Sequence, residues 1–346
     1  MMHSRNSAIV PFRVLAMLVC WCRISMVSAD ASLPCQFDDS RDIAFRTSEV
    51  AEWQPFGEAL PPPISDLDNP EAPYAEELTT SPRLANQRTA PRWSWHWLPE
   101  GLIYHSTMAG VHEPRMALVS FYEASDGRTL WDATLGGRVG LIQYGNGDPV
   151  SPVGYQLDFY GAAIARLDVD NRQNLDSTDY VFGLPLTIGD KELQFKIGYA
   201  HISSHLGDEY AILHPGSLAQ RINYVRDSIE FGASYYWNPA WRLYGEVDWA
   251  FHRSGGARPL AFEFGTEYSE PGPTGRRFTP FMAINARLRQ EHNYGGDLAV
   301  QAGWLRRNLL DHTLRFGLHY YNGKSSQSQF FTTSEEQIGA GVWYDF

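Results

Sequence analysis

The sequence lacks the features of several common protein classes. Cysteine is rare, with 3 residues in 346, and because Cys20 and Cys22 lie in a segment that we expect to be removed, Cys35 has no partner for a disulfide or a cysteine metal cluster. Basic residues are in deficit: 28 Lys and Arg against 40 Asp and Glu give a net charge of −12. Binding to phosphate backbones requires a basic surface, so nucleic acid is not expected as a partner.

Long hydrophobic runs are also missing from most of the chain. Hydrophobic residues make up 43% of the sequence and aromatic residues 14%, yet the mean hydropathy is −0.34. Apolar residues must therefore be interleaved with polar ones, which is a pattern of strands rather than of membrane-spanning helices.

The N-terminal part differs in character from the rest. Arg13 precedes an apolar run over residues 14–21, and small residues follow it, as in a secretory signal peptide. The run is shorter than the roughly 20 residues that a membrane-spanning helix needs. We predict a signal peptide over residues 1–29, a Pro-rich periplasmic arm or linker over 30–99, and a separate domain over 100–346.

Three tryptophans stand near the end of this arm and leave two interpretations open. Trp93, Trp95 and Trp97 alternate with polar residues. They are expected either to plug or cap the domain that follows, or to form an aromatic belt where the chain meets lipid headgroups.

Beyond the arm, the dominant pattern is an alternation of period two. In the last segment, Ile338, Ala340 and Val342 share one face with Tyr344 and Phe346. Alternating strands cross a bilayer only as a closed barrel, because backbone polar groups cannot stay unpaired in hydrocarbon. The predicted fold is therefore all-β, a closed antiparallel transmembrane β-barrel of about 12 strands, whereas a soluble sandwich would turn its apolar faces inward. The predicted strands are 115–124, 129–142, 153–168, 178–189, 191–203, 219–237, 241–252, 260–269, 278–291, 296–306, 312–322 and 336–346.

The C-terminus indicates where in the cell the protein lies, and the polar faces of these strands indicate what lines the inside of the barrel. The final Phe346 resembles the signature by which bacterial outer-membrane barrels are recognised by the barrel-assembly machinery, so we expect the bacterial outer membrane and that partner. Charged residues opposite the apolar faces are expected to pair inside the lumen, as in a structural or weakly transporting barrel. These residues are Arg242, Glu246, Asp248, Glu263, Glu267, Arg287 and Arg289.

One hairpin carries a pattern of polar residues that indicates a catalytic site. Parity places His201 and Ser203 on the lipid face of one strand, and Asn223 and Asp227 on the lipid face of the next. If His201 pairs with Asn223, a Ser nucleophile, a His base and an orienting Asn meet; a register shift of four puts Asp227 in place of Asn223. His201 follows Lys191 by ten residues, which at about 3.3 Å per residue and a 45° tilt places it near the outer edge of an apolar band about 25 Å tall. A lipid acyl ester is the substrate within reach.

This hairpin resembles that of the outer-membrane phospholipase A family, in which a His-x-Ser pair and an Asn on the next strand face outward from a twelve-stranded barrel. His201 and Ser203 match the pair and Asn223 the third position. The hairpin is also similar to that of lipid A deacylase barrels, which use His-x-Ser with an acid, the role that Asp227 would take. Over its whole length the chain resembles an uncharacterised bacterial family, domain of unknown function 1207, in residues 203–209 and in the segment that starts at Glu336. That resemblance implies an exported barrel and no known activity.

Other candidate residues give weaker signals. Asp208 and Glu209 are expected either to bind a calcium ion that assists an oxyanion or to be solvated loop residues. The pair His112-Glu113, together with His252 and His292, shows no convergent partner in the sequence, and no zinc spacing, phosphate loop or Gly-x-Ser-x-Gly motif is present. Two functions stay open, a non-enzymatic barrel and an outer-membrane acyl hydrolase, with outer-membrane lipid and a second copy of the chain as expected partners.

Overall fold

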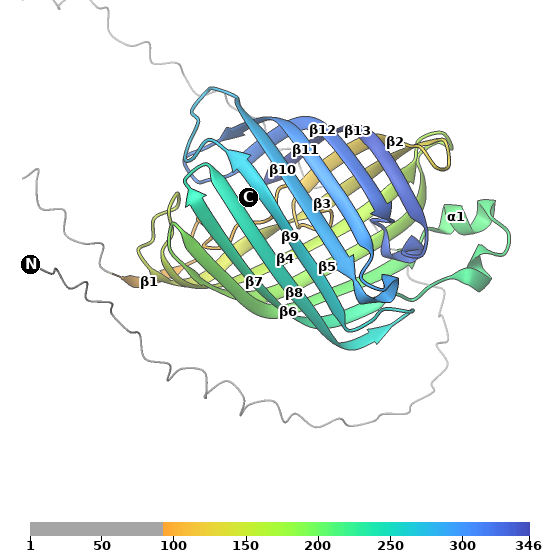
Figure 1. Ribbon diagram of the computed structural model, residues 1–346, viewed down its shortest axis with the longest axis horizontal. Coiled ribbons are helices and arrows are strands. Elements are labelled where there is room, and N and C mark those ends of the chain that lie inside the picture. The colour runs from red at the N-terminus through yellow and green to blue at the C-terminus, as the bar shows by residue number, and fades with distance from the viewer. Residues whose placement is uncertain (1–92) are drawn as a thin grey trace, which may run out of the picture. The chain divides into compact units, whose positions relative to one another are not determined.

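The computed structural model describes residues 93–346, so the predicted signal peptide and most of the predicted arm lie outside the described residues. Thirteen strands form one sheet in the order β1-β3-β2-β13-β12-β11-β10-β9-β8-β7-β6-β5-β4, and pairing of β3 with β4 closes it. Strands β2 to β13 form a closed twelve-stranded antiparallel barrel, as the sequence predicts (Figure 1). Their bounds are β2 Met116–Glu123, β3 Arg128–Gly145, β4 Gly154–Asp168, β5 Asn174–Gly189, β6 Leu193–Leu206, β7 Val225–Asn238, β8 Trp241–Ser254, β9 Leu260–Ser269, β10 Thr279–Arg289, β11 Gly296–Arg307, β12 Thr313–Lys324 and β13 Ser334–Asp345.

The alternation of side chains explains the barrel. On β6, Leu193, Phe195 and Ile197 are exposed on the outer wall, whereas Gln194 and Lys196 are buried towards the lumen. Successive side chains of a strand point to opposite faces, so one wall becomes apolar and the other polar. Among residues 93–346, no helix combines the length and the apolar character that crossing a bilayer would need.

The connection between β6 and β7 is longer than predicted. A strand was expected from residue 219, but β7 begins at Val225. The connection instead holds the short helices α1 (Asp208–Leu213) and η1 (Ser217–Gln220), and Gly216 adopts a φ of 94° just before η1. Residues 219 and 220 therefore belong to η1 and residues 221–224 to the loop that leads into β7.

Strand β1 (Ser94–Trp97) was not predicted. It pairs with the end of β3, with Ser94 opposite Gly145 and Trp97 opposite Ile142. The exposed fractions of Trp93, Trp95 and Trp97 are 44%, 66% and 78%. These indoles therefore lie outside the lumen, and the interpretation that they plug the barrel is wrong.

The residues after β1 fill the lumen instead. Ile103 and Tyr104 are almost completely buried, and the Tyr104 hydroxyl donates a hydrogen bond to Glu246 Oε1 over 2.8 Å. We call residues 99–115 the plug segment. Arg242 donates to the backbone carbonyls of His105 and Ser106 at 2.8 and 3.3 Å, and Arg315 donates to that of Met108 at 3.2 Å. Arginines of the barrel wall thus satisfy carbonyls that burial would otherwise leave unpaired.

The plug segment enters and leaves at the end of the barrel that holds the short β5–β6 and β7–β8 turns. His105 is 3.0 Å from Asp311, in the β11–β12 turn, and Arg115 is 3.2 Å from Asp345 near the C-terminus. We call this end the turn end. The opposite, loop end is covered by the β12–β13 connection, in which residues 325–329 are buried.

Buried ion pairs line the lumen. Lys196 Nζ lies 3.0 Å from Glu230 and 2.8 Å from Glu246. Further pairs are Arg138–Asp158, Arg166–Asp132, Arg166–Glu335, Arg226–Asp248, Arg242–Glu267, Arg289–Asp297 and Arg315–Asp345. Of the charged residues expected to pair inside, five are in these ion pairs, namely Arg242, Glu246, Asp248, Glu267 and Arg289, and their pairing offsets the cost of removing charges from water. The other two make polar contacts instead, Glu263 with Asn285 and Arg287 with His112.

Candidate functional site

The candidate site lies on the outer wall of the barrel, across β6, β7 and β8, near the loop end. These strands are neighbours in the sheet (Figure 1). The register places His201 opposite Asp227 and Ser203 opposite Val225. Residues that are directly opposite in an antiparallel pair have Cβ atoms about 4.5–5.5 Å apart, so His201 and Asp227 are within contact.

The carboxylate of Asp227 is the centre of the cluster. Its Oδ1 lies 2.7 Å from His201 Nδ1 and accepts a hydrogen bond from the Tyr199 hydroxyl over 2.5 Å. Its Oδ2 lies 2.7 Å from His252 Nδ1. The side chain of Asp227 is only 19% exposed, and three donors from two neighbouring strands hold it in place. Hydrogen bonds to an ionised carboxylate are among the stronger ones in proteins.

His252 reaches this cluster because of a β-bulge in β8. Ser228 pairs with Ala250 but Asp227 pairs with His252, so Phe251 is the extra residue. A bulge inserts one residue and changes the face to which the following side chains point. The expectation that His252 has no convergent partner is therefore wrong, and strict alternation could not have predicted this contact.

An aromatic ring fixes the orientation of His201. Its imidazole stacks on Phe182 of β5, with the ring centroids 4.7 Å apart and the planes at 29°. The side chain of His201 is 18% exposed. With Nδ1 directed at Asp227, Nε2 is the nitrogen that can exchange a proton with another group.

Ser203 occupies the same face two residues further along β6, next to Tyr180 of β5. Within the described residues the Ser203 hydroxyl has no hydrogen bond to His201. The hydrogen bond between nucleophile and base is often long before substrate binds. A serine, an imidazole and a carboxylate in this order can perform nucleophilic acyl transfer.

The third position is filled by Asp227 and not by Asn223. Asn223 lies in the loop before β7, where its backbone carbonyl accepts a hydrogen bond from Ser254 Oγ over 2.6 Å. The assumed pairing of His201 with Asn223 is therefore wrong, because β7 begins two residues later than that pairing requires. The observed register is the alternative one, shifted by four residues.

The two proposed calcium ligands are not part of a cluster of metal-binding side chains in the described residues. Asp208 and Glu209 form the first turn of α1 and are exposed. In residues 93–346, no group of three or more His, Cys, Asp or Glu side chains is arranged to hold a metal ion. Calcium binding by these two carboxylates stays a prediction.

A second polar cluster lies inside the lumen. His112 of the plug segment lies 3.3 Å from Asp179 through Nε2 and 2.8 Å from Arg287 through Nδ1. His112, Arg287 and Glu263 border a cavity of about 120 Å³. Burial lowers the pKa of His112, and the neighbouring Arg287 acts in the same direction. The sequence showed no partner for His112, because both contacts depend on the path of the plug segment.

Fold and site together define a closed β-barrel with a plug segment in its lumen and a polar Ser, His and Asp cluster on its outer wall. The chain belongs to the family described as "Protein of unknown function (DUF1207)", which matches residues 76–346. No curated protein matches the sequence. The resemblance to this family is thereby confirmed over residues 76–346, whereas the local resemblance to outer-membrane phospholipase A stays a prediction.

Proposed function

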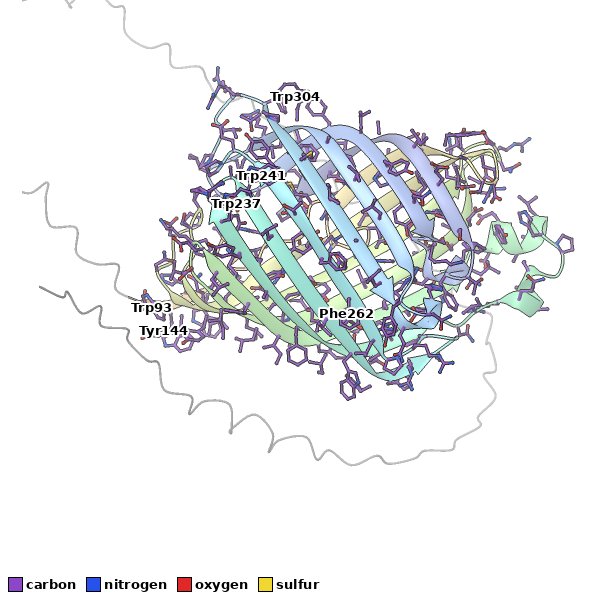
Figure 2. The ribbon with its side chains drawn as sticks, viewed as in Figure 1. Trp93, Tyr144, Trp237, Trp241, Phe262 and Trp304 are labelled. Atoms are coloured by element: carbon purple, nitrogen blue, oxygen red, sulfur yellow. The ribbon has the colours of Figure 1, made fainter. Side chains whose placement is uncertain are left out.

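We propose that this chain is an integral protein of the bacterial outer membrane. Figure 2 shows Trp93, Tyr144, Trp237, Trp241 and Trp304 around the turn end of the barrel. Aromatic residues of this kind gather where a barrel meets the lipid headgroups. Recognition of Phe346 by the assembly machinery and pairing of two copies stay predictions.

The location is tested by expressing the full chain in a Gram-negative host and separating its two membranes. The protein is expected in the outer-membrane fraction, with mobility on unheated gels that differs from that of the boiled protein. Recovery as a soluble periplasmic protein would overturn the proposal.

We further propose that the outer wall carries a serine acyl hydrolase that acts on membrane lipid. The observation that supports this function best is the 2.7 Å contact between Asp227 Oδ1 and His201 Nδ1, with Ser203 on the same face. In the proposed reaction His201 Nε2 takes the proton of the Ser203 hydroxyl while its oxygen attacks the ester carbonyl. Asp227 stabilises the resulting imidazolium, which then protonates the leaving alcohol, and water releases the fatty acid.

The surroundings of Ser203 favour a lipid as substrate. Tyr180 and Phe182 on β5 and Phe251 on β8 are 46%, 41% and 50% exposed on the same wall. Apolar side chains beside an outward serine offer an acyl chain a surface continuous with the membrane interior. A soluble ester would have to displace lipid from this surface first.

Release of fatty acid from phospholipid by the detergent-refolded protein tests this function. Wild type is expected to release fatty acid and Ser203→Ala is expected to lose that turnover, while Ser125→Ala, in the exposed β2–β3 turn, keeps it. Parallel reactions with calcium and with a chelator test Asp208 and Glu209. Absence of turnover from correctly folded wild type would refute the hydrolase.

A purely structural barrel is the second candidate, and the plug segment favours it over a transporter. The plug and the buried 325–329 connection obstruct the lumen from the two ends. Wild-type protein in planar lipid bilayers is therefore expected to show no steady conductance. A stable open channel would overturn this assignment and restore the transport interpretation.

A further inference from the structure

The outer wall carries not one but two His-x-Ser pairs, arranged on either side of β7. His201 and Ser203 lie on β6, and His252 and Ser254 lie on β8. Asp227 is opposite both histidines and Val225 is opposite both serines. The two pairs are therefore related by an approximate mirror through β7, with one carboxylate between them.

The bulge at Phe251 creates this arrangement. Beyond the bulge, Asp227 pairs with His252 and Val225 with Ser254. Asp227 faces the outer wall, so the side chains directly opposite on β8 face it as well. Without the extra residue, β8 would present a different pair of side chains to Asp227 and Val225.

The local chemistry of the two pairs matches in its main features. Each histidine directs Nδ1 at a different oxygen of Asp227 over 2.7 Å. Each therefore has its Nε2 available, and each has a serine two residues further along its own strand on the same face. The Ser254 hydroxyl donates to the backbone carbonyl of Asn223 over 2.6 Å, so it has to turn from this carbonyl to His252 before its proton can be transferred.

We propose that Ser254 is a second nucleophile, with His252 as its base, and that both serines depend on Asp227. This proposal rests on the proposed acyl hydrolase and extends it to a second position. The Ser254 hydroxyl gives its proton to His252 Nε2 as its oxygen forms a bond to the ester carbonyl carbon. The bond to the leaving alcohol breaks, that alcohol takes the proton, and water then hydrolyses the acyl-serine to a carboxylic acid.

The two positions differ in how far neighbouring side chains cover them. The side chain of His201 is 18% exposed and stacks on Phe182, whereas that of His252 is 66% exposed. Ser203 thus lies beside aromatic side chains, whereas Ser254 lies on a more open part of the wall. We expect Ser254 to act on short-chain or single-chain esters, which need no long apolar surface beside the serine, and Ser203 on long acyl chains, which can pack on Tyr180 and Phe182.

Labelling with a fluorophosphonate, which reacts with activated serines, tests the proposal on the refolded full chain. Peptide mass spectrometry of wild type is expected to find the label on both Ser203 and Ser254. Ser203→Ala should keep the label on Ser254. His252→Gln should reduce labelling of Ser254 by about 10²-fold or more while Ser203 stays labelled, since general-base catalysis contributes on that order.

Three other results would overturn the proposal in part or as a whole. Label on Ser203 alone overturns the second nucleophile and leaves the hydrolase intact. Label on Ser254 that persists in His252→Gln also overturns it, because His252 is then not the base. Label on neither serine, with Ser125 as the unreactive reference, overturns both the hydrolase and the second nucleophile.

Discussion

Asp227 Oδ2 lies 2.7 Å from His252 Nδ1, although strict alternation along β8 would turn His252 away from it. Asp227 Oδ1 makes the equivalent contact with His201. One carboxylate therefore orients two imidazoles, and the cluster depends on Asp227 more than on either histidine.

Asp227→Asn is expected to lower ester hydrolysis by about 10²- to 10⁴-fold, because the amide can no longer stabilise an imidazolium at His201. The initial rate of fatty-acid release measures the effect. Asn223→Ala is the matched control: its side chain lies in the loop before β7, and the backbone carbonyl that accepts from Ser254 is unchanged. If both variants lost the same fraction of the activity, the activity would not depend on the observed pairing of His201 with Asp227.

Deletion of residues 102–110 is expected to open the barrel to ions. This part of the plug segment supplies the carbonyls that Arg242 and Arg315 bind, and it fills the lumen. Single-channel recording in planar bilayers should show conductance for the deletion variant but not for wild type. His105→Gln, which leaves the plug backbone in place, serves as the control. A deletion variant that folds and stays closed would show that side chains of the wall block the lumen by themselves.

Lys196→Met is expected to lower the free energy of unfolding by about 3–5 kcal/mol, because it leaves two buried carboxylates without their counter-charge. Lys196 Nζ lies within 3.0 Å of both Glu230 and Glu246, and its side chain is 7% exposed. Urea unfolding of the refolded protein in detergent measures the change. Lys191→Met, in the exposed β5–β6 turn, should change the value by only about 0.5 kcal/mol or less.

The free energy of unfolding is expected to decrease as the pH is lowered, because His112 titrates. Its pKa in the folded protein is lowered by burial and by Arg287 from the ordinary value of 6.5. Above pH 6.5 the imidazole is neutral in both states, so His112 adds no pH dependence there. Below that pH the unfolded chain takes up the proton first, and the folded state is destabilised until the pH reaches the folded pKa.

Urea unfolding at pH 7.5 and pH 5.5 measures this slope. His112→Gln keeps a polar side chain but cannot titrate, so the difference between wild type and variant isolates the contribution of His112 from that of other groups. Wild type should lose more stability between the two pH values than the variant does. Equal slopes would show that the plug segment admits enough water to solvate a protonated His112.

Much of the fold could be predicted because its pattern is local. Alternation of apolar and polar side chains identified all twelve barrel strands, and parity placed His201 and Ser203 on the outer wall. The start of β7 was placed too early, at residue 219, whereas residues 219 and 220 belong to η1 and residues 221–224 to the loop. Because the start of β7 was misplaced, Asn223 was expected opposite His201 in place of Asp227.

The contacts of the candidate site could be predicted only in part. A pairing of His201 with either Asn223 or Asp227 follows from alternation, but choosing between them requires the register. Tyr199 and Phe182 gave a usable signal, because they are aromatic residues on the same face as His201 or directly beside it. His252 gave none, since nothing in the sequence of β8 marks Phe251 as a bulge.

The sequence by itself determined the class of architecture, because a period of two with apolar and polar faces can satisfy a buried backbone only in a closed sheet. It also determined which residues face outward along each continuous strand. Only the tertiary structure decided the register of β6 with β7, the bulge that turns His252 and Ser254 outward, and the path of the plug segment through the lumen. These features depend on pairing and packing between distant segments, and an alternating pattern is nearly unchanged by a shift of two or four residues.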